Sequence, residues 1–112
     1  MMERIVYAVI LAGLAGVAYA HQAPSGFQYS AFCCNGDGES GDCQPIPSQD
    51  VKIHGANYEF SLKPGDHRLA THGHLFSVPQ SKAMMSMDGF YHLCLFPNED
   101  VVRCFYAPQM NF

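Results

Sequence analysis

Five cysteines in a chain of 112 residues are the feature that most limits how this sequence can fold. A small domain buries little apolar surface, and exported proteins of this size commonly gain the missing stability from disulfides. Because the number of cysteines is odd, two intramolecular bridges can form and one thiol is left over. The cysteines are Cys33, Cys34, Cys43, Cys94 and Cys104.

The spacing of the cysteines narrows their pairing but leaves alternatives open. If residues 97–101 form the loop of a hairpin, Cys94 lies opposite Cys104 and the two can bridge across the strands. Cys43 is near enough in sequence to bridge to Cys33 or Cys34. Adjacent cysteines seldom bond each other, because the geometry is strained. We expect mainly structural roles, and the remaining thiol is a candidate metal ligand, intermolecular bridge or redox group.

The first twenty residues predict a cleaved export signal. Residues 5–18 form an uncharged and almost wholly apolar run that follows Arg4. Ala18 and Ala20 are small residues at the positions that signal peptidase reads. The run is shorter than the roughly 20 apolar residues of a spanning helix. We therefore expect cleavage after Ala20, no membrane span after cleavage, a single domain over residues 21–112, and a periplasmic or secreted location.

The remainder of the chain has the residue pattern of short strands and turns. Apolar and polar residues alternate over residues 51–54 and 58–62, which predicts a hairpin with Ile53 on its core side. Asp88-Gly89 predicts a second hairpin, after the methionine-rich segment. Further strands are expected over residues 29–32, 74–78, 90–96 and 101–106. The predicted fold class is all-β, a small disulfide-stapled antiparallel sheet or sandwich of short hairpins.

Charge and motifs argue against several classes of function. The net charge is −4, with 10 acidic and 6 basic residues and no basic stripe, so we expect no binding to nucleic acid. The sequence has no phosphate-binding loop, nucleophile elbow or HExxH motif. Enzymatic activity is therefore the less favoured expectation, and the expected partners are a metal ion and another exported protein.

The six histidines, all of which lie beyond Ala20, carry the sharper hypothesis. Cleavage after Ala20 makes His21 the N-terminal residue, whose free amine and imidazole can chelate one metal ion. Copper is the expected metal, because Cu(II) binds nitrogen ligands most tightly among the divalent first-row ions, and zinc is the alternative. His92 shares strand parity with Cys94, so it is either a hydrogen-bonded core residue or a ligand. The other candidate ligands are His67, His72, His74 and the thioethers of Met84 and Met87.

Two resemblances bear on this hypothesis. The CCxG, DCxP and DGxxHxC motifs at residues 33–36, 42–45 and 88–94 resemble those of a family of short exported proteobacterial proteins without an established function. The PGDH sequence at residues 64–67 and the CFYAP sequence at residues 104–108 are similar to the same family. That resemblance implies an architecture, and it places His67 and His92 on family motifs. We therefore prefer these two as partners of His21 over the histidines of the THGH segment, residues 71–74. His21 itself resembles the histidine brace of copper proteins such as lytic polysaccharide monooxygenases and related copper carriers.

Three functions from different classes follow from the sequence. The first is an exported, disulfide-stabilised protein that binds copper through His21 as a carrier or buffer. The second is a structural or protein-interaction module without a metal. The third is a small copper oxidase, which ranks last because the chain is too short to add an extended substrate face to a metal site.

Overall fold

The computed structural model describes residues 22–34 and 41–108, which form two β-sheets and contain two disulfides. The all-β prediction is therefore confirmed. Two short 3-10 helices, η1 (Ser48–Asp50) and η2 (Gln80–Lys82), precede strands β2 and β5. The strands of the described residues are β1 (Cys43–Ile46), β2 (Val51–His54), β3 (Asn57–Leu62), β4 (His74–Pro79), β5 (Met84–Ser86), β6 (Tyr91–Leu95) and β7 (Val102–Pro108).

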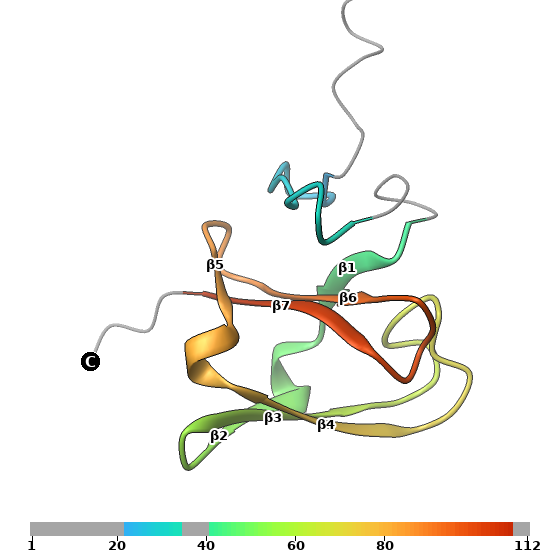
Figure 1. Cartoon of the computed structure of the whole chain (residues 1–112). Coiled ribbons are helices and arrows are strands. Elements are labelled where there is room, and N and C mark those ends of the chain that lie inside the picture. Colours follow the sequence, from blue (N-terminus) through green and yellow to red (C-terminus); the bar gives the residue numbers. More distant parts are fainter. Residues whose placement is uncertain (1–21, 35–40, 109–112) are drawn as a thin grey trace, which may run out of the picture.

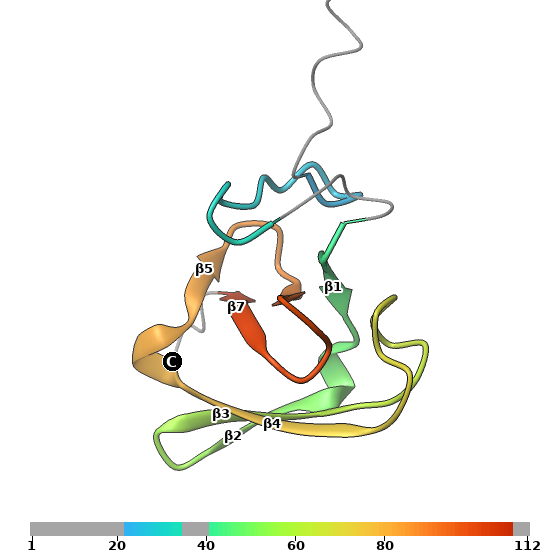
Figure 2. The same ribbon diagram turned by 45° about the vertical axis from the view of Figure 1, so that its right-hand side comes forward.

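These elements are arranged in three layers (Figures 1 and 2). The four-stranded sheet, in the order β1-β6-β7-β5, lies in the middle. The three-stranded sheet, in the order β2-β3-β4, packs on one of its faces, and the N-terminal arm, residues 22–34, covers the other face. Neighbouring strands are antiparallel except β5 and β7, which run parallel.

Strands β6 and β7 are buried on both faces. Because successive side chains of a strand point to opposite faces, alternate residues enter different cores. Leu93 and Leu95 of β6 belong to the core between the two sheets, where Phe105 of β7 stacks on Phe60 at 4.7 Å between ring centroids. Cys94 of β6 instead faces the arm, in a second core that contains all five cysteines. The middle sheet therefore separates an aromatic and aliphatic core from a sulfur-rich core.

The hairpin predicted over residues 51–62 is present, but one side chain expected in its core is exposed. Strands β2 and β3 pair as expected, with Val51 opposite Phe60. Ile53 was expected in the core but is 43% exposed. Strand β2 is an edge strand of its sheet, and of its apolar residues only Val51 packs against the core. Alternation thus identified the strand but not how far the core extends beneath it.

Two local predictions are wrong. Asp88-Gly89 connects β5 to β6, but these strands do not form a hairpin, because β7 lies between them. The Asp88 carboxylate instead accepts hydrogen bonds from the Phe90 amide at 3.1 Å and from His92. Residues 29–32, expected as a strand, belong to none: a turn covers residues 31–33, and the Cys33 and Cys34 amides both donate to the Ser30 carbonyl.

The disulfides join different partners from those expected. Cys94 and Cys104 do lie opposite each other in the β6–β7 register, but they do not bond each other. Cys94 is also opposite Cys43 of β1 and bonds it, with the Cα atoms 4.0 Å apart, and Cys104 bonds Cys33 of the arm. Cys34 stays a thiol, buried in the same core. The pairing of β1 with β6, which the sequence does not reveal, decides this connectivity.

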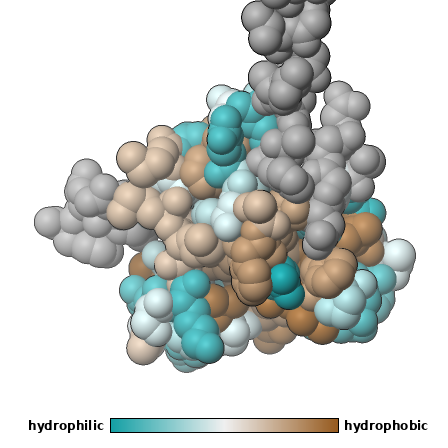
Figure 3. Space-filling view, turned by 45° about the horizontal axis from the view of Figure 1, so that its top comes forward, coloured by the Kyte–Doolittle hydropathy of each residue, from teal (hydrophilic) through white to brown (hydrophobic). Residues whose placement is uncertain are grey.

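The surface of the described residues includes several large apolar side chains. Figure 3 shows hydrophobic residues reaching the surface between polar groups. The most exposed of them are Met87 at 80%, Leu75 at 68% and Phe32 at 67%. Within residues 22–34 and 41–108, no helix is long and apolar enough to cross a membrane.

Candidate metal centre

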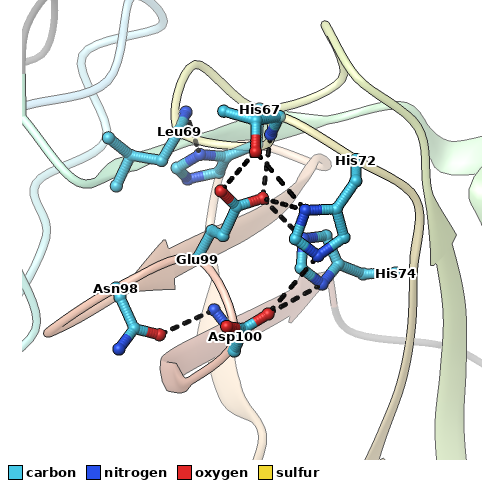
Figure 4. Close-up of polar contacts among 8 residues, drawn as sticks. His67, Leu69, His72, His74, Asn98, Glu99 and Asp100 are labelled. Atoms are coloured by element: carbon cyan, nitrogen blue, oxygen red, sulfur yellow. Dashed lines mark hydrogen bonds and ion pairs between the residues drawn. The ribbon is translucent and has the colours of Figure 1, made fainter.

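Two imidazoles and a carboxylate converge where the β3–β4 connection meets the β6–β7 loop (Figure 4). His74 is the first residue of β4, and His72 lies two positions before it, in the bend at residues 71–72. Their ring centroids are 4.2 Å apart. Glu99 lies in the loop between β6 and β7, and its carboxylate lies beside both rings.

One oxygen of Glu99 is the centre of this cluster. Its Oε1 is 2.8 Å from Nε2 of His74 and 3.3 Å from Nδ1 of His72. The Thr71 amide also donates to Oε1 at 2.8 Å, and the Thr71 hydroxyl donates to Oε2 at 2.6 Å. The hydrogen bonds from the Thr71 hydroxyl and from His74 lower the pKa of Glu99 to about 2. The carboxylate is therefore an anionic acceptor, and Nε2 of His74 carries the proton of their hydrogen bond.

Asp100 lies on the opposite side of the same two rings. Its Oδ1 is 3.5 Å from Nε2 of His72 and 3.7 Å from Nδ1 of His74. Each imidazole therefore has one nitrogen toward Glu99 and the other toward Asp100 (Figure 4). The backbone amide of Asp100 donates a hydrogen bond to Oδ1 of Asn98 at 2.9 Å, which holds this part of the loop.

The cluster is buried on one side and open on the other. The His74 side chain is 7% exposed and stacks on Phe76 with the rings 8° from parallel. Glu99 is 18% exposed, whereas the side chain of His72 is 59% exposed and that of Asp100 is 68% exposed. An ion bound here would have firm support from His74 and Glu99 and access to solvent beside His72.

The donor set fits a divalent transition metal. One donor atom from each of His72, His74 and Glu99 lies within 4.8 Å of the other two. Bonds of about 2.0–2.1 Å in a tetrahedral site place donor atoms roughly 3.3 Å apart. The His72–Glu99 distance already has this value, and the His74–Glu99 distance would have to lengthen by about 0.5 Å. Imidazole and carboxylate ligands suit zinc and Cu(II).

His67, one of the preferred ligands, is fully buried and uses both ring nitrogens. Its Nε2 donates to the carbonyl oxygens of Asp42 and Leu93, each at 3.1 Å, and its Nδ1 accepts from the Leu69 amide at 3.2 Å. Burial lowers the pKa of His67, and these hydrogen bonds suit the neutral ring. In this conformation the imidazole ties the β3–β4 connection to the middle sheet.

His92, the other preferred ligand, is also fully buried and hydrogen-bonded on both sides. Nδ1 lies 2.8 Å from the hydroxyl of Tyr29, and Nε2 lies 2.9 Å from Asp88. Phe27 stacks on the imidazole at 4.9 Å. Burial lowers the pKa of His92 and raises that of Tyr29, so the tyrosine hydroxyl donates to a neutral ring. His92 is therefore a hydrogen-bonded core residue beneath the arm, which is one of the two roles expected for it.

The remaining candidate ligands lie apart from the histidine cluster or outside the described residues. His21 lies outside the described residues. Met84 has its sulfur 3.7 Å from that of Cys33, and Met87 lies at the exposed end of the same methionine-rich segment. His54, which was not a candidate ligand, is 74% exposed and lies 3.6 Å from Glu59.

A second group of donor atoms lies in the sulfur-rich core, where Cys34, Asp42 and Cys43 are close together and buried. Cys43 is bonded to Cys94, so its sulfur is not available as a thiolate. Burial and the nearby Asp42 charge raise the pKa of the Cys34 thiol, which disfavours the form that binds metals. This group is therefore a part of the packed core.

Sequence reasoning identified the histidines of the cluster but missed its carboxylates. His72 and His74 are among the ligands predicted from the sequence, although His67 and His92 are the preferred ones. Glu99 and Asp100 stood out only as part of a turn between two strands. They meet the histidines because the β3–β4 connection and the β6–β7 loop lie at the same end of the two sheets (Figures 1 and 2). The sequence carries no local signal of that meeting.

Comparison of the chain with protein-family models, with curated proteins and with solved structures gives no significant match. The chemistry of the side chains described above is therefore the basis for inferring function.

Proposed function

We propose that this protein is an exported, disulfide-stabilised carrier or buffer of a divalent transition metal, bound by His72, His74 and Glu99. The observation that carries the proposal is the convergence of both imidazoles on one oxygen of Glu99, at 2.8 and 3.3 Å. Export is supported by the apolar N-terminal run and by the two disulfides, which persist in oxidising compartments.

Copper and zinc are the metals that this donor set favours. Two imidazoles and a carboxylate suit both ions, and Cu(II) binds such ligands more tightly than zinc does in solution. Three protein donors leave at least one coordination position to water or to an outside ligand. Because His72 is exposed, that position is accessible, which fits a protein that takes up and releases an ion rather than one that encloses it.

The proposal is tested by titrating the purified, metal-free protein with Zn(II) and Cu(II) against a chromophoric chelator. We expect one ion per chain, and the E99Q variant should bind at least 10-fold more weakly, because an amide replaces the anionic donor. E59Q is the matched control, because Glu59 also lies beside a histidine, His54, on a strand of the same sheet as His74. Equal affinities of E99Q and E59Q would contradict the proposal.

The N-terminal chelate at His21 is the alternative copper site, and the same titration distinguishes the two sites. Adding one glycine before the mature N-terminus moves the free amine away from the His21 imidazole and should abolish a chelate there. It should leave binding at Glu99 unchanged. Loss of copper in the extended protein, with normal affinity in E99Q, would assign the ion to His21 instead.

A further inference from the structure

We propose that Asp100 is the positioning residue of this metal centre, and that it directs the ion to Nδ1 of His72 and Nε2 of His74. This inference rests on the proposed function, because it concerns the same site. It starts from the two carboxylates, which face opposite nitrogens of the same two rings. A metal on the Glu99 side therefore leaves the other nitrogen of each ring toward Asp100.

Metal binding changes which nitrogen of His74 carries the proton. Without metal, Nε2 donates its hydrogen to Oε1 of Glu99 at 2.8 Å. A neutral imidazole has one N–H, so an ion on Nε2 requires the proton to reside on Nδ1. Nδ1 faces Oδ1 of Asp100 at 3.7 Å, which is longer than a hydrogen bond, so the aspartate can accept this proton once the two atoms approach each other.

The movement needed to admit the ion also favours Asp100. Tetrahedral bond lengths require the distance between Nε2 of His74 and Oε1 of Glu99 to increase by about 0.5 Å. This increase moves the ring away from Glu99. Because Asp100 lies on the opposite side, the same movement shortens its distance to Nδ1. For His72 no such opening is needed, and its Nε2 is already 3.5 Å from Asp100.

One carboxylate thus serves both imidazoles without binding the ion. Histidine ligands commonly donate their second N–H to a carboxylate, which fixes the ring orientation and makes the ligand more basic. The turn that carries Asp100 does not depend on its side chain, since Asn98 supports it through the backbone amide. Removal of the exposed carboxylate should therefore leave the fold intact.

The test compares D100A and D100E with the unchanged protein, with zinc as the probe. We expect D100A to bind zinc about 10- to 100-fold more weakly, and D100E to recover most of the affinity. E59A, which removes a carboxylate beside His54, should bind as the unchanged protein does. Circular dichroism of each variant confirms that the fold is retained.

Nitrogen-15 NMR of the histidine rings gives a readout that a merely structural role would not move. On adding zinc, Nδ1 of His72 and Nε2 of His74 should shift to the metal-bound range, and Nδ1 of His74 should become protonated. His67 should be unchanged, because protein groups already occupy both of its nitrogens. In D100A the two rings should lose this single pattern and populate both tautomers.

The outcomes separate this inference from the proposed function. If the unchanged protein takes up no zinc at these histidines, the proposed function fails. If it takes up zinc at Glu99, but D100A binds equally well with the same nitrogens, the role of Asp100 is overturned. Zinc bound through Nε2 of His72 or Nδ1 of His74 would also overturn it, because those atoms face Asp100.

Discussion

The burial of one residue, His67, bears on how the stability of the whole protein changes in acid. Its ring is fully buried, and its Nε2 donates to two backbone carbonyls that belong to different segments, Asp42 and Leu93. Burial holds the pKa of His67 below its ordinary value, which in an unfolded chain is about 6.5. Below that pH the unfolded chain therefore binds a proton that the folded chain does not.

The expected consequence is a loss of stability as the pH falls from about 6.5, with full stability above that value. H67Q should lower the free energy of unfolding near pH 7.5 by about 1–3 kcal/mol, because buried hydrogen bonds are lost. It should also make stability depend less on pH between 7.5 and 5. Urea unfolding of both metal-free proteins across that range measures the difference. A pH dependence in H67Q as steep as that of the unchanged protein would contradict this account.

At the scale of elements, the β3–β4 connection positions the histidines and depends on one glycine. Gly65 has a φ of +95° in the turn where the Asp66 amide donates to the Lys63 carbonyl at 2.9 Å. The Lys-Pro-Gly-Asp sequence predicts this turn, since proline suits its second position and glycine tolerates positive φ at the third. Gly73, between the two histidines, has no positive φ, and a Cβ there would meet only the Leu62 carbonyl at 3.8 Å.

Alanine substitutions at these two glycines should therefore have different effects on stability. G65A should destabilise the protein by about 1–2 kcal/mol, because a left-handed conformation is unfavourable for alanine. G73A should change stability little, since the contact at 3.8 Å is an ordinary one. Thermal unfolding of the two variants decides the matter. A larger loss in G73A than in G65A would show that the backbone of this connection differs from the one described.

Elements were predictable from the sequence where local pattern alone decides them. The 51–62 hairpin and the opposition of Cys94 and Cys104 followed from alternation and loop length. The hairpin predicted at Asp88-Gly89 is wrong, because the turn preference of a dipeptide does not indicate that β7 lies between β5 and β6. The burial of His92 likewise depends on Tyr29 and Phe27, which lie more than sixty residues away in the arm.

At the scale of the whole molecule, both disulfides lie on the arm side of the middle sheet. Cys33–Cys104 joins the arm to β7 and Cys43–Cys94 joins β1 to β6, and the partners are 71 and 51 positions apart in the sequence. Neither bridge reaches the three-stranded sheet, which is held by the aromatic and aliphatic core. The proposed metal centre lies where that sheet meets the β6–β7 loop, so an ion bound there would add a link between the sheets that the disulfides do not provide.

Reduction should therefore destabilise the protein strongly. Loops of these lengths contribute about 4 kcal/mol per bridge in the chain-entropy description, against a net stability of about 5–15 kcal/mol for a typical domain. We expect the urea midpoint to fall sharply in reductant. C34A retains both bridges and should show a similar fall. If the midpoint of the unchanged protein did not move in reductant, the two bridges would not have the stabilising role assigned to them.

The position of a bound ion tests the central claim most directly. Anomalous diffraction from crystals of the zinc- or copper-loaded protein locates the metal without reference to activity. We predict a single strong peak about 2.0–2.1 Å from Nδ1 of His72, Nε2 of His74 and Oε1 of Glu99. A peak at His21, His67 or His92, or no peak at Glu99 in crystals grown with excess metal, would contradict the account.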